Sequence, residues 1–319
     1  MLNRRTAMSA AALAALPTVW AQSDFPNRPL RLILPLQAGG IADVAARAVM
    51  LELEKNLGKP IVVDNKPGGQ FLIALQALQS APADGYTMLA LNANFCAIQV
   101  VSKLYDVQKA FTPVSINTEA AFSLIVSGKS PFKTFAEFLD FARKNPNKLN
   151  YAVPGLGTME HMKNVQLANA AGFTATAVPY KSGGPDMVKG VIGGEVDYTI
   201  CPTFLAKMFS ANGSVRNLLV VHDTASKDFP DVPTLPQAGI KIDPLRVWGG
   251  YAVHNDTPPA LVQRLYLAIT ETMKSPALVE KHISMGASVN ASKNTEEARK
   301  MIASELAWMN AVLPALKLQ

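Results

Sequence analysis

The segment LRLILPLQAGGIADVAAR, residues 30–47, decides how this chain begins its fold. Its first part, LRLILP, has the composition of a buried strand. A Gly-Gly turn follows at Gly39 and Gly40, and a helical pattern begins directly after it. Such a turn presents backbone N–H groups at a helix N-terminus, where negative groups bind. The segment predicts a strand, a tight turn and a helix, with a candidate anion site at the turn.

The chain continues with short apolar runs that alternate with helical patterns. Strands are predicted at 30–35, 60–65 and 84–92, with helices at 42–58 and 72–80 between them. Because a helix separates each strand from the next, these strands are expected to run parallel under a cover of helices.

A second unit of the same kind follows a long extended segment at 114–128. Its strands are predicted at 149–153, 174–180, 196–201 and 215–221, and its helices at 134–145, 158–171, 185–193 and 203–211. A proline-rich segment, 226–240, then leads to a strand at 246–253 and to helices at 258–274 and 295–312. Two α/β units joined by two crossings predict two lobes with a cleft between them and a hinge beneath it.

The composition is that of a globular protein. Of its 319 residues, 49% are hydrophobic and 17% are charged, which is enough to build a large core. The net charge of +6 is mild and the basic residues form no runs, so no nucleic-acid partner is expected. A weak positive field favours a small anion instead.

The N-terminus, residues 1–21, is typical of a secretory signal. It carries Arg4 and Arg5, then an Ala/Leu stretch, and ends in the small-x-small pattern VWA. A membrane anchor is the alternative, but the apolar run is shorter than the roughly 20 residues that a span needs. We expect cleavage after Ala21 and an exported, periplasmic protein that is not embedded in the membrane; the arginine pair leaves the twin-arginine route open.

Enzyme motifs are missing from the sequence. It has no G-x-S-x-G nucleophile elbow and no HExxH pair, and its four histidines are scattered. No catalytic residue, metal ligand or cofactor is therefore assigned. Cys96 and Cys201 lack a CxxC partner, which excludes zinc and thioredoxin chemistry. Export permits a disulfide between them, but two separate buried thiols are the favoured alternative.

A nucleotide-cofactor-dependent enzyme is one alternative that the pattern leaves open. The strand at 30–35, the Gly39-Gly40 turn and Asp64 after the next helix resemble the order of a Rossmann unit. The third glycine of G-x-G-x-x-G is missing, however, and Asp43 would lie close to the phosphates. A second glycine-containing loop, YAVPGLGT at 151–158, again joins a strand to a helix. Two helix N-termini that face each other across a cleft would hold a small di-anion or amino acid without any catalytic side chain.

Six segments of the chain carry a family resemblance: FPNRPLRLILPLQAGGIADVAAR, LGKPIVVDNKPG, APADGYTML, LNYAVPGLGT, VPYKSGGPDMVKGVIGGEVD and FPDVPTLPQAGI. In this order they resemble the Bug receptors, the extracytoplasmic solute-binding proteins of tripartite tricarboxylate transporters. The resemblance implies an α/β fold of the two-lobe periplasmic-binding-protein kind, type II-like, in which each lobe is a sheet flanked by helices and the cleft is hinged. It also implies a binding protein, not an enzyme, that captures a carboxylate and delivers it to membrane transporter subunits.

The resemblance further implies a set of ligand-binding residues. Backbone N–H groups and ordered water would hold the carboxylate at a first loop, with Ala38, Gly39, Gly40, Ile41 and Asp43, and at a second loop, 153–158, with Val153, Gly155, Gly157 and Thr158. Asp43 is expected to order the first loop or its water. Asn92, Asn94 and Lys181 are expected to add polar contacts.

Several positions depart from the family's pattern, and several of them lose polar atoms. Gln70, Phe71 and Leu72 stand where the family has two glycines and an asparagine, and Leu36 stands where an aromatic residue is usual. Val153, Cys96 and Cys201 replace a usual serine, histidine and aspartate, and Phe95 is the neighbour of Cys96. Because a buried polar group without a partner costs about 1–3 kcal/mol, we expect a ligand with one carboxylate and an apolar or aromatic body. Phe71 and Phe95 would line that body, and simple core packing is the alternative for both.

The predicted lobes are interleaved along the chain. Residues 22–122 and 222–319 would form the first lobe and 123–221 the second, and a monomer is expected. Closure of the lobes around the ligand would create the form that a transporter recognises. A ligand sensor that signals to a partner protein needs the same closing cleft, so this alternative stays open.

Overall fold

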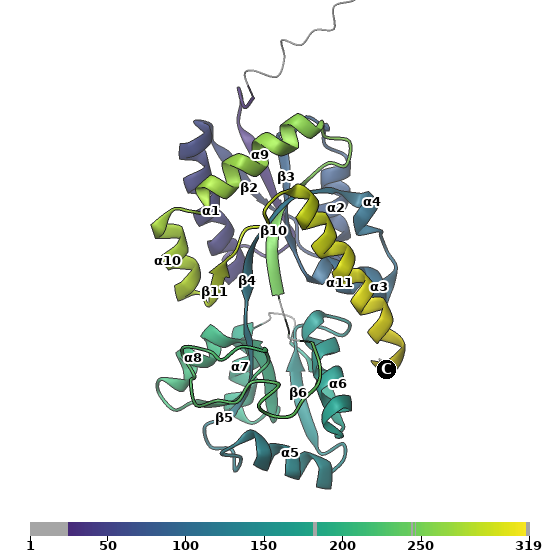
Figure 1. Cartoon of the computed structure of the whole chain (residues 1–319), viewed down its shortest axis with the longest axis vertical. Coiled ribbons are helices and arrows are strands. Elements are labelled where there is room, and N and C mark those ends of the chain that lie inside the picture. The colour runs from purple at the N-terminus through teal and green to yellow at the C-terminus, as the bar shows by residue number, and fades with distance from the viewer. Residues whose placement is uncertain (1–24, 181–183, 244, 246, 317–319) are drawn as a thin grey trace, which may run out of the picture.

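The computed structural model describes residues 25–180, 184–243, 245 and 247–316. The predicted signal segment, 1–21, and Lys181 lie outside these residues. The described chain forms two lobes stacked along the long axis of the molecule, each with its own sheet (Figure 1). This is the two-lobe α/β architecture that the sequence predicts. No helix in the described part has the length and hydropathy that a membrane span requires.

The first lobe is built on a six-stranded sheet in the order β11-β4-β10-β3-β1-β2. Strands β1 (Leu30–Leu34), β2 (Ile61–Asn65) and β3 (Thr87–Asn92) are parallel, as their alternation with helices predicts. Strand β10 (Val247–Val253) runs antiparallel to β3 and to β4 (Thr112–Ala120), and β11 (Ala287–Val289) pairs antiparallel with β4 at the edge. The sheet is therefore mixed, and its parallel half comes from the N-terminal segment.

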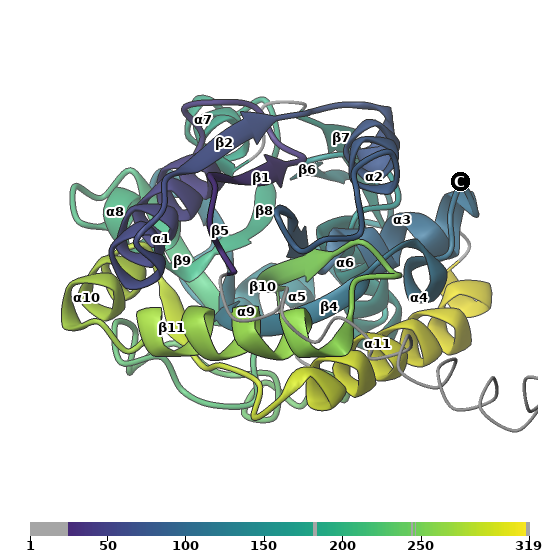
Figure 2. The ribbon, with the colours of Figure 1, turned by 90° about the horizontal axis from the view of Figure 1, so that it is seen from above.

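Successive side chains of each strand point to opposite faces of this sheet. In β1, Leu30, Leu32 and Leu34 join a buried cluster with α1 (Ile41–Leu57), α9 (Pro259–Thr272) and α10 (Pro276–Ser284). Ile33 joins a different cluster with α2 (Leu72–Gln79), α3 (Asn94–Ser102) and α11 (Thr295–Leu316). Helices α9 and α11 run along one side of the molecule, where both contact β4 (Figure 2).

The second lobe is built on a five-stranded sheet in the order β7-β6-β8-β5-β9. Its strands are β5 (Phe122–Ser127), β6 (Leu149–Val153), β7 (Ala175–Pro179), β8 (Tyr198–Pro202) and β9 (Val215–Val220). Strand β6 is parallel to β7 and β8, whereas β5 is antiparallel to β8 and β9. Helices α5 (Phe135–Lys144) and α6 (Met159–Ala171) cover one face, and α7 (Gly184–Gly193) and α8 (Thr203–Ser210) cover the other.

Most predicted elements are confirmed to within a few residues. The extended segment at 114–128 is divided at Ala121 into β4 and β5, which belong to different lobes. The sequence pattern did not predict α3, α4 (Val107–Ala110), α10, β11 or a short 3₁₀ turn, η2 (Gly69–Phe71). The start of α3 has a local cause, because the side-chain oxygen of Asn92 accepts the N–H of Asn94 at 3.0 Å.

The chain crosses between the lobes twice. Only Ala121 separates β4 from β5, so the first crossing is a nearly continuous extended segment. The return from β9 to β10 is tied to the second lobe: Val220 N–H donates to Pro233 O at 2.9 Å, and Leu245 N–H donates to Val221 O at 3.1 Å. The boundaries at 122 and 222 stay predictions.

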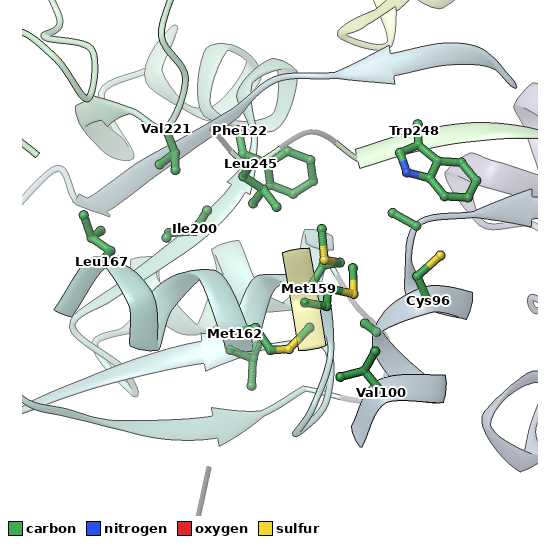
Figure 3. Packing of buried hydrophobic residues seen from close by; sticks show 14 of the residues in the cluster. Cys96, Val100, Phe122, Met159, Met162, Leu167, Ile200, Val221, Leu245 and Trp248 are labelled. Carbon is green, nitrogen blue, oxygen red and sulfur yellow. The ribbon is translucent and has the colours of Figure 1, made fainter. Parts of the chain in front are cut away.

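An apolar cluster continues from one lobe into the other. Met159 and Met162 of α6 lie close to Cys96 and Val100 of α3, with Trp248 of β10 nearby (Figure 3). Helix α11 also contacts α6. Nine of the thirteen residues of α6 are buried, although they include Glu, His, Lys and Asn. Helices of the first lobe therefore cover a helix of the second.

Lys163 lies in this interlobe contact with its side chain fully buried. Its ammonium group donates to Gln166 Oε1 at 2.6 Å and to Asp243 O at 2.8 Å, and it lies 4.4 Å from the centre of the Trp308 ring of α11. Trp308 donates in turn to Asp243 Oδ2 at 2.6 Å. Burial lowers the pKa of Lys163 to about 8, against the opposing effect of the Asp243 and Glu305 charges.

Replacing Lys163 by Met is expected to change how stability depends on pH. Because the pKa of Lys163 falls from 10.5 to about 8 on folding, the unfolded chain binds more protons in this window. Stability contributed by this group therefore rises with pH from about 8 to 10.5. Lys163→Met should remove this rise, which is worth about 3 kcal/mol for such a shift. Urea unfolding of both proteins across this pH range measures the difference.

Lys144→Met, at an exposed position of α5, is the matched control. It should leave the pH dependence of stability as in the wild type. If the free energy of unfolding of the wild type and of Lys163→Met depended on pH in the same way, the lowered pKa of the buried Lys163 would be contradicted.

Candidate functional site

The candidate site lies at the edge of the first sheet that faces the second lobe. Strands β1 and β3 are parallel neighbours, so their carboxyl ends meet at one edge. The chain after β3 enters α3, which contacts α6 of the second lobe, and the chain after β1 enters α1. In open α/β sheets, ligands bind outside the carboxyl ends of parallel strands.

The first loop, 36–40, leaves its backbone open. Residues 37–40 are exposed. Gly39 has a φ of +82°, which glycine adopts without the steric cost that a Cβ would bring. Gly40 is the N-cap of α1, and no side chain caps the helix there. The N–H groups of the first turn therefore remain for a bound anion, which the helix dipole also favours.

Asp43 orders this loop from the first turn of α1. Its Oδ2 accepts the Gly39 N–H and the Arg47 Nε–H, both at 3.0 Å, and its Oδ1 accepts from Asn65 Nδ2 at 3.0 Å. Asn65 Nδ2 also donates to Leu36 O at 3.0 Å. The hydrogen bond from Arg47 lowers the pKa of Asp43 to about 2. The carboxylate is thus engaged by Gly39 of the loop, Arg47 of α1 and Asn65 of β2, and Asp43 acts as a positioning residue.

Two members of this network, Arg47 and Asn65, were not among the residues predicted from the sequence. Arg47 stands four residues after Asp43 on one helix, which is the spacing of a helical ion pair, so a signal for it was present. Asn65 comes from β2, and the parallel register of β1 and β2 places it opposite Leu34, beside the loop.

The second loop, 153–158, uses amides in bonds of its own. The Gly157 N–H donates to His161 Nδ1 at 2.9 Å, and the Thr158 N–H donates to Gly155 O at 3.3 Å. Thr158 caps α6, since its Oγ1 accepts the His161 N–H at 3.4 Å. Burial lowers the pKa of His161. A neutral ring leaves Nδ1 able to accept, so His161 holds the loop in place.

Asn94 connects the two lobes directly. Its Oδ1 accepts the N–H of Met159, the first residue of α6, at 3.0 Å. Beside this bond Gly157 lies against Val101 of α3, and a Cβ on Gly157 would approach the Val101 side chain to 3.0 Å. The start of α3 and the second loop are therefore in contact.

The apolar residues predicted at the site lie at different depths. Phe95 is fully buried in the core, and the half-buried Phe71 lies with its ring centre 4.6 Å from that of Phe95. Val153 and Cys201 are also fully buried, whereas Leu36 is half-buried. Core packing therefore accounts for Phe95 in this structure, and Phe71 and Leu36 keep exposed surface.

Side chains that bear metal or redox chemistry do not gather in the described part of the chain. Cys96 and Cys201 are both free and buried: Cys96 lies in the apolar cluster that spans both lobes, and Cys201 lies in a separate cluster of the second lobe. Burial raises the pKa of Cys201 to about 12, which makes it an unreactive thiol. Among the described residues, no group of three or more His, Cys, Asp or Glu side chains is placed to hold a metal ion.

Comparison with protein families gives a match over most of the chain. A family model described as "Tripartite tricarboxylate transporter family receptor" matches residues 45–318. The chain is also 32% identical over 271 residues to a "UPF0065 protein in gbd 5'region" of Cupriavidus necator, over 85% of this chain and 82% of that protein.

Two solved structures share the fold of the described chain. The periplasmic binding protein BugD matches with a TM-score of 0.81 at 25% identity, over 92% of this chain and 99% of that one. Rpa4515 of R. palustris, solved with adipate, matches with a TM-score of 0.80 at 26% identity, over 92% of this chain and 98% of that one.

Asp43→Asn is expected to loosen the first loop. An Nδ2 group in place of Oδ2 accepts from neither Gly39 nor Arg47, so the free energy of unfolding at neutral pH should fall by about 1–3 kcal/mol. Because the pKa of Asp43 is lowered from 3.8 to about 2, this stabilisation is present above 3.8 and is lost as the pH falls through 2. Urea unfolding gives the stability, and hydrogen exchange of residues 36–43 should become faster.

Asp140→Asn removes a carboxylate from an exposed pair with Lys144 and is the matched control. It should change stability by less than about 1 kcal/mol. Equal effects of the two substitutions would contradict the role given to Asp43.

Proposed function

The chain belongs to the receptor family of tripartite tricarboxylate transporters, and we propose that it binds a small carboxylate between its lobes. The observation that carries this proposal is the first loop, whose uncapped N–H groups stand open at the start of α1 and are held in place by Asp43. A carboxylate fits these donors because it is negative and accepts several hydrogen bonds. The adipate bound to Rpa4515 supports the same ligand class.

We infer that the protein is an exported, periplasmic receptor that has no catalytic role and works as a monomer. The signal pattern at 1–21 and the description of BugD as a periplasmic binding protein support export. With 22–122 and 222–319 in one lobe and 123–221 in the other, closure would present the loaded form to membrane transporter subunits. A ligand sensor is the second candidate, and the family's link to transporters favours delivery.

The body of the ligand is proposed to be apolar. Leu36 and Phe71 carry this part of the proposal, because both are only half-buried and have surface left to contact a ligand. Phe95 supports the ring of Phe71 from the core. Apolar walls leave hydroxyl and additional carboxylate groups of a ligand without partners.

Calorimetry against acetate, hexanoate, benzoate and citrate tests the ligand class. Hexanoate or benzoate is expected to bind at least about tenfold more tightly than citrate. Tight binding of citrate with no response to hexanoate or benzoate would contradict the apolar body.

Gly40→Asp is expected to abolish carboxylate binding without unfolding the protein. Gly40 has a φ of −75° and a ψ of 167°, which any L residue adopts, and a Cβ there meets only Gln37 O at 3.7 Å. An aspartate at this N-cap would accept the N–H groups of the first turn and repel a second anion. Affinity should fall at least about 100-fold, while the melting temperature stays equal or rises.

Gly40→Ala is the matched control, because it adds a Cβ without a charge or an acceptor. It should change affinity by less than about threefold. Undiminished binding of carboxylates by Gly40→Asp would show that the first loop does not hold them.

A further inference from the structure

The two loops of the site differ in whether a side chain caps the helix that follows them. In the second loop and the turn that follows it, the N–H groups of Gly157, Thr158, Met159 and His161 all have acceptors. In the first loop Gly39 donates to Asp43, but no side chain caps the turn that starts at Gly40. A turn without a cap is therefore present at the first loop alone.

Asn94, in the first lobe, contacts the end of the second loop, which belongs to the second lobe. Its backbone is held in place, because its N–H donates to Asn92 Oδ1 at 3.0 Å. Its Oδ1 takes the Met159 N–H at 3.0 Å, a donor that a helix N-terminus would otherwise offer to a ligand. A ligand group could use this donor only by displacing Asn94, which would break a hydrogen bond between the lobes.

The surroundings of this donor also disfavour a further negative charge. Glu160, next to Met159 in the first turn of α6, is buried, and its Oε2 has no hydrogen-bond partner. Burial raises the pKa of Glu160. Lys163, one turn further along, already donates to Gln166 and Asp243. At the start of α6, desolvation therefore outweighs the hydrogen bonds from the Thr158 side chain and the Glu160 backbone that favour the charged carboxylate.

We infer that Asn94 makes this site selective for ligands with a single carboxylate, which the first loop holds. The inference rests on the proposed function and narrows it to monocarboxylates. Asn94 acts by filling the place that a second carboxylate would need. Selectivity arises because a second carboxylate entering the cleft would lose its hydration and find the amides at the start of α6 already bonded.

The test compares each dicarboxylate of four to eight carbons with its own monomethyl ester, as in adipate and monomethyl adipate. The ester keeps the length of the ligand and removes one charge. Calorimetry should give the wild type at least about a tenfold preference for the monoester of the best-binding pair. Equal or tighter binding of the dicarboxylate would overturn the inference.

Variants at Asn94 connect this preference to the side chain. Asn94→Ala frees the Met159 N–H and should lower the preference for the monoester by at least about fivefold. Asn94→Asp keeps an acceptor at the same place and should retain the preference. Val101→Ala, at the same contact but without a hydrogen bond, is the control and should leave the ratio unchanged. If Asn94→Ala keeps the wild-type ratio in a folded protein, Asn94 is not the selective residue.

Failure of the inference differs from failure of the proposed function. If dicarboxylates and monoesters both bind and the dicarboxylate is preferred, the receptor function stands and the role of Asn94 falls. If no carboxylate binds to the wild type, both fall together. If Asn94→Ala does not fold, the ratio of the wild-type affinities for the monoester and the dicarboxylate still tests whether the protein prefers monocarboxylates.

Discussion

The burial of helix α6 is the constraint on which the arrangement of the two lobes depends. The helix packs on the second sheet, yet nine of its thirteen residues are buried because α3 and α11 of the first lobe cover it as well. Burying a side chain such as Met159 or Met162 contributes about 1.5–3 kcal/mol. The same contact brings Asn94 to the Met159 N–H and removes Lys163 from water. The contact between the lobes and the position of the second loop therefore depend on this one helix.

The two glycine-containing loops both join a strand to a helix but differ in their chemistry. Gly40 offers no side chain to cap α1, and Asp43 stabilises that loop from the helix side, which leaves the outer amides open. Thr158 caps α6, His161 accepts an amide of the second loop, and Asn94 accepts the amide of Met159 at the start of α6. The start of α6 is therefore capped in this structure, whereas the start of α1 has no side-chain cap. Asp43 keeps its charge over the whole physiological range, since its pKa is held at about 2, so the open loop stays ordered there.

Local patterns predicted most of the fold because the strands and helices carry strong periodicity. The parallel β1, β2 and β3, both sheets and the strand–turn–helix units followed from alternation and glycine positions. Helix α3 was not predicted from the sequence, because its apolar residues follow those of β3 almost without a break. Its start also depends on a hydrogen bond to the Asn92 side chain. Helix α10 does have a start signal in the sequence, because Ser275 is its N-cap and Pro276 its first residue. Phe95 shows the limit for the site: a phenylalanine next to a predicted pocket residue looks the same whether it faces a ligand or the core.

By itself, the sequence determined the two-lobe α/β class and the position of the open glycine turn, since both depend on residues close together in the chain. The tertiary structure alone decided which amides remain free and which charged groups are buried. Asn94 meets Met159, Asn65 meets Asp43, and Lys163 meets Trp308 across long stretches of sequence. Hydrogen bonds and burial between distant segments leave no periodic pattern in the sequence, because each depends on the register and packing of elements that lie far apart in the chain.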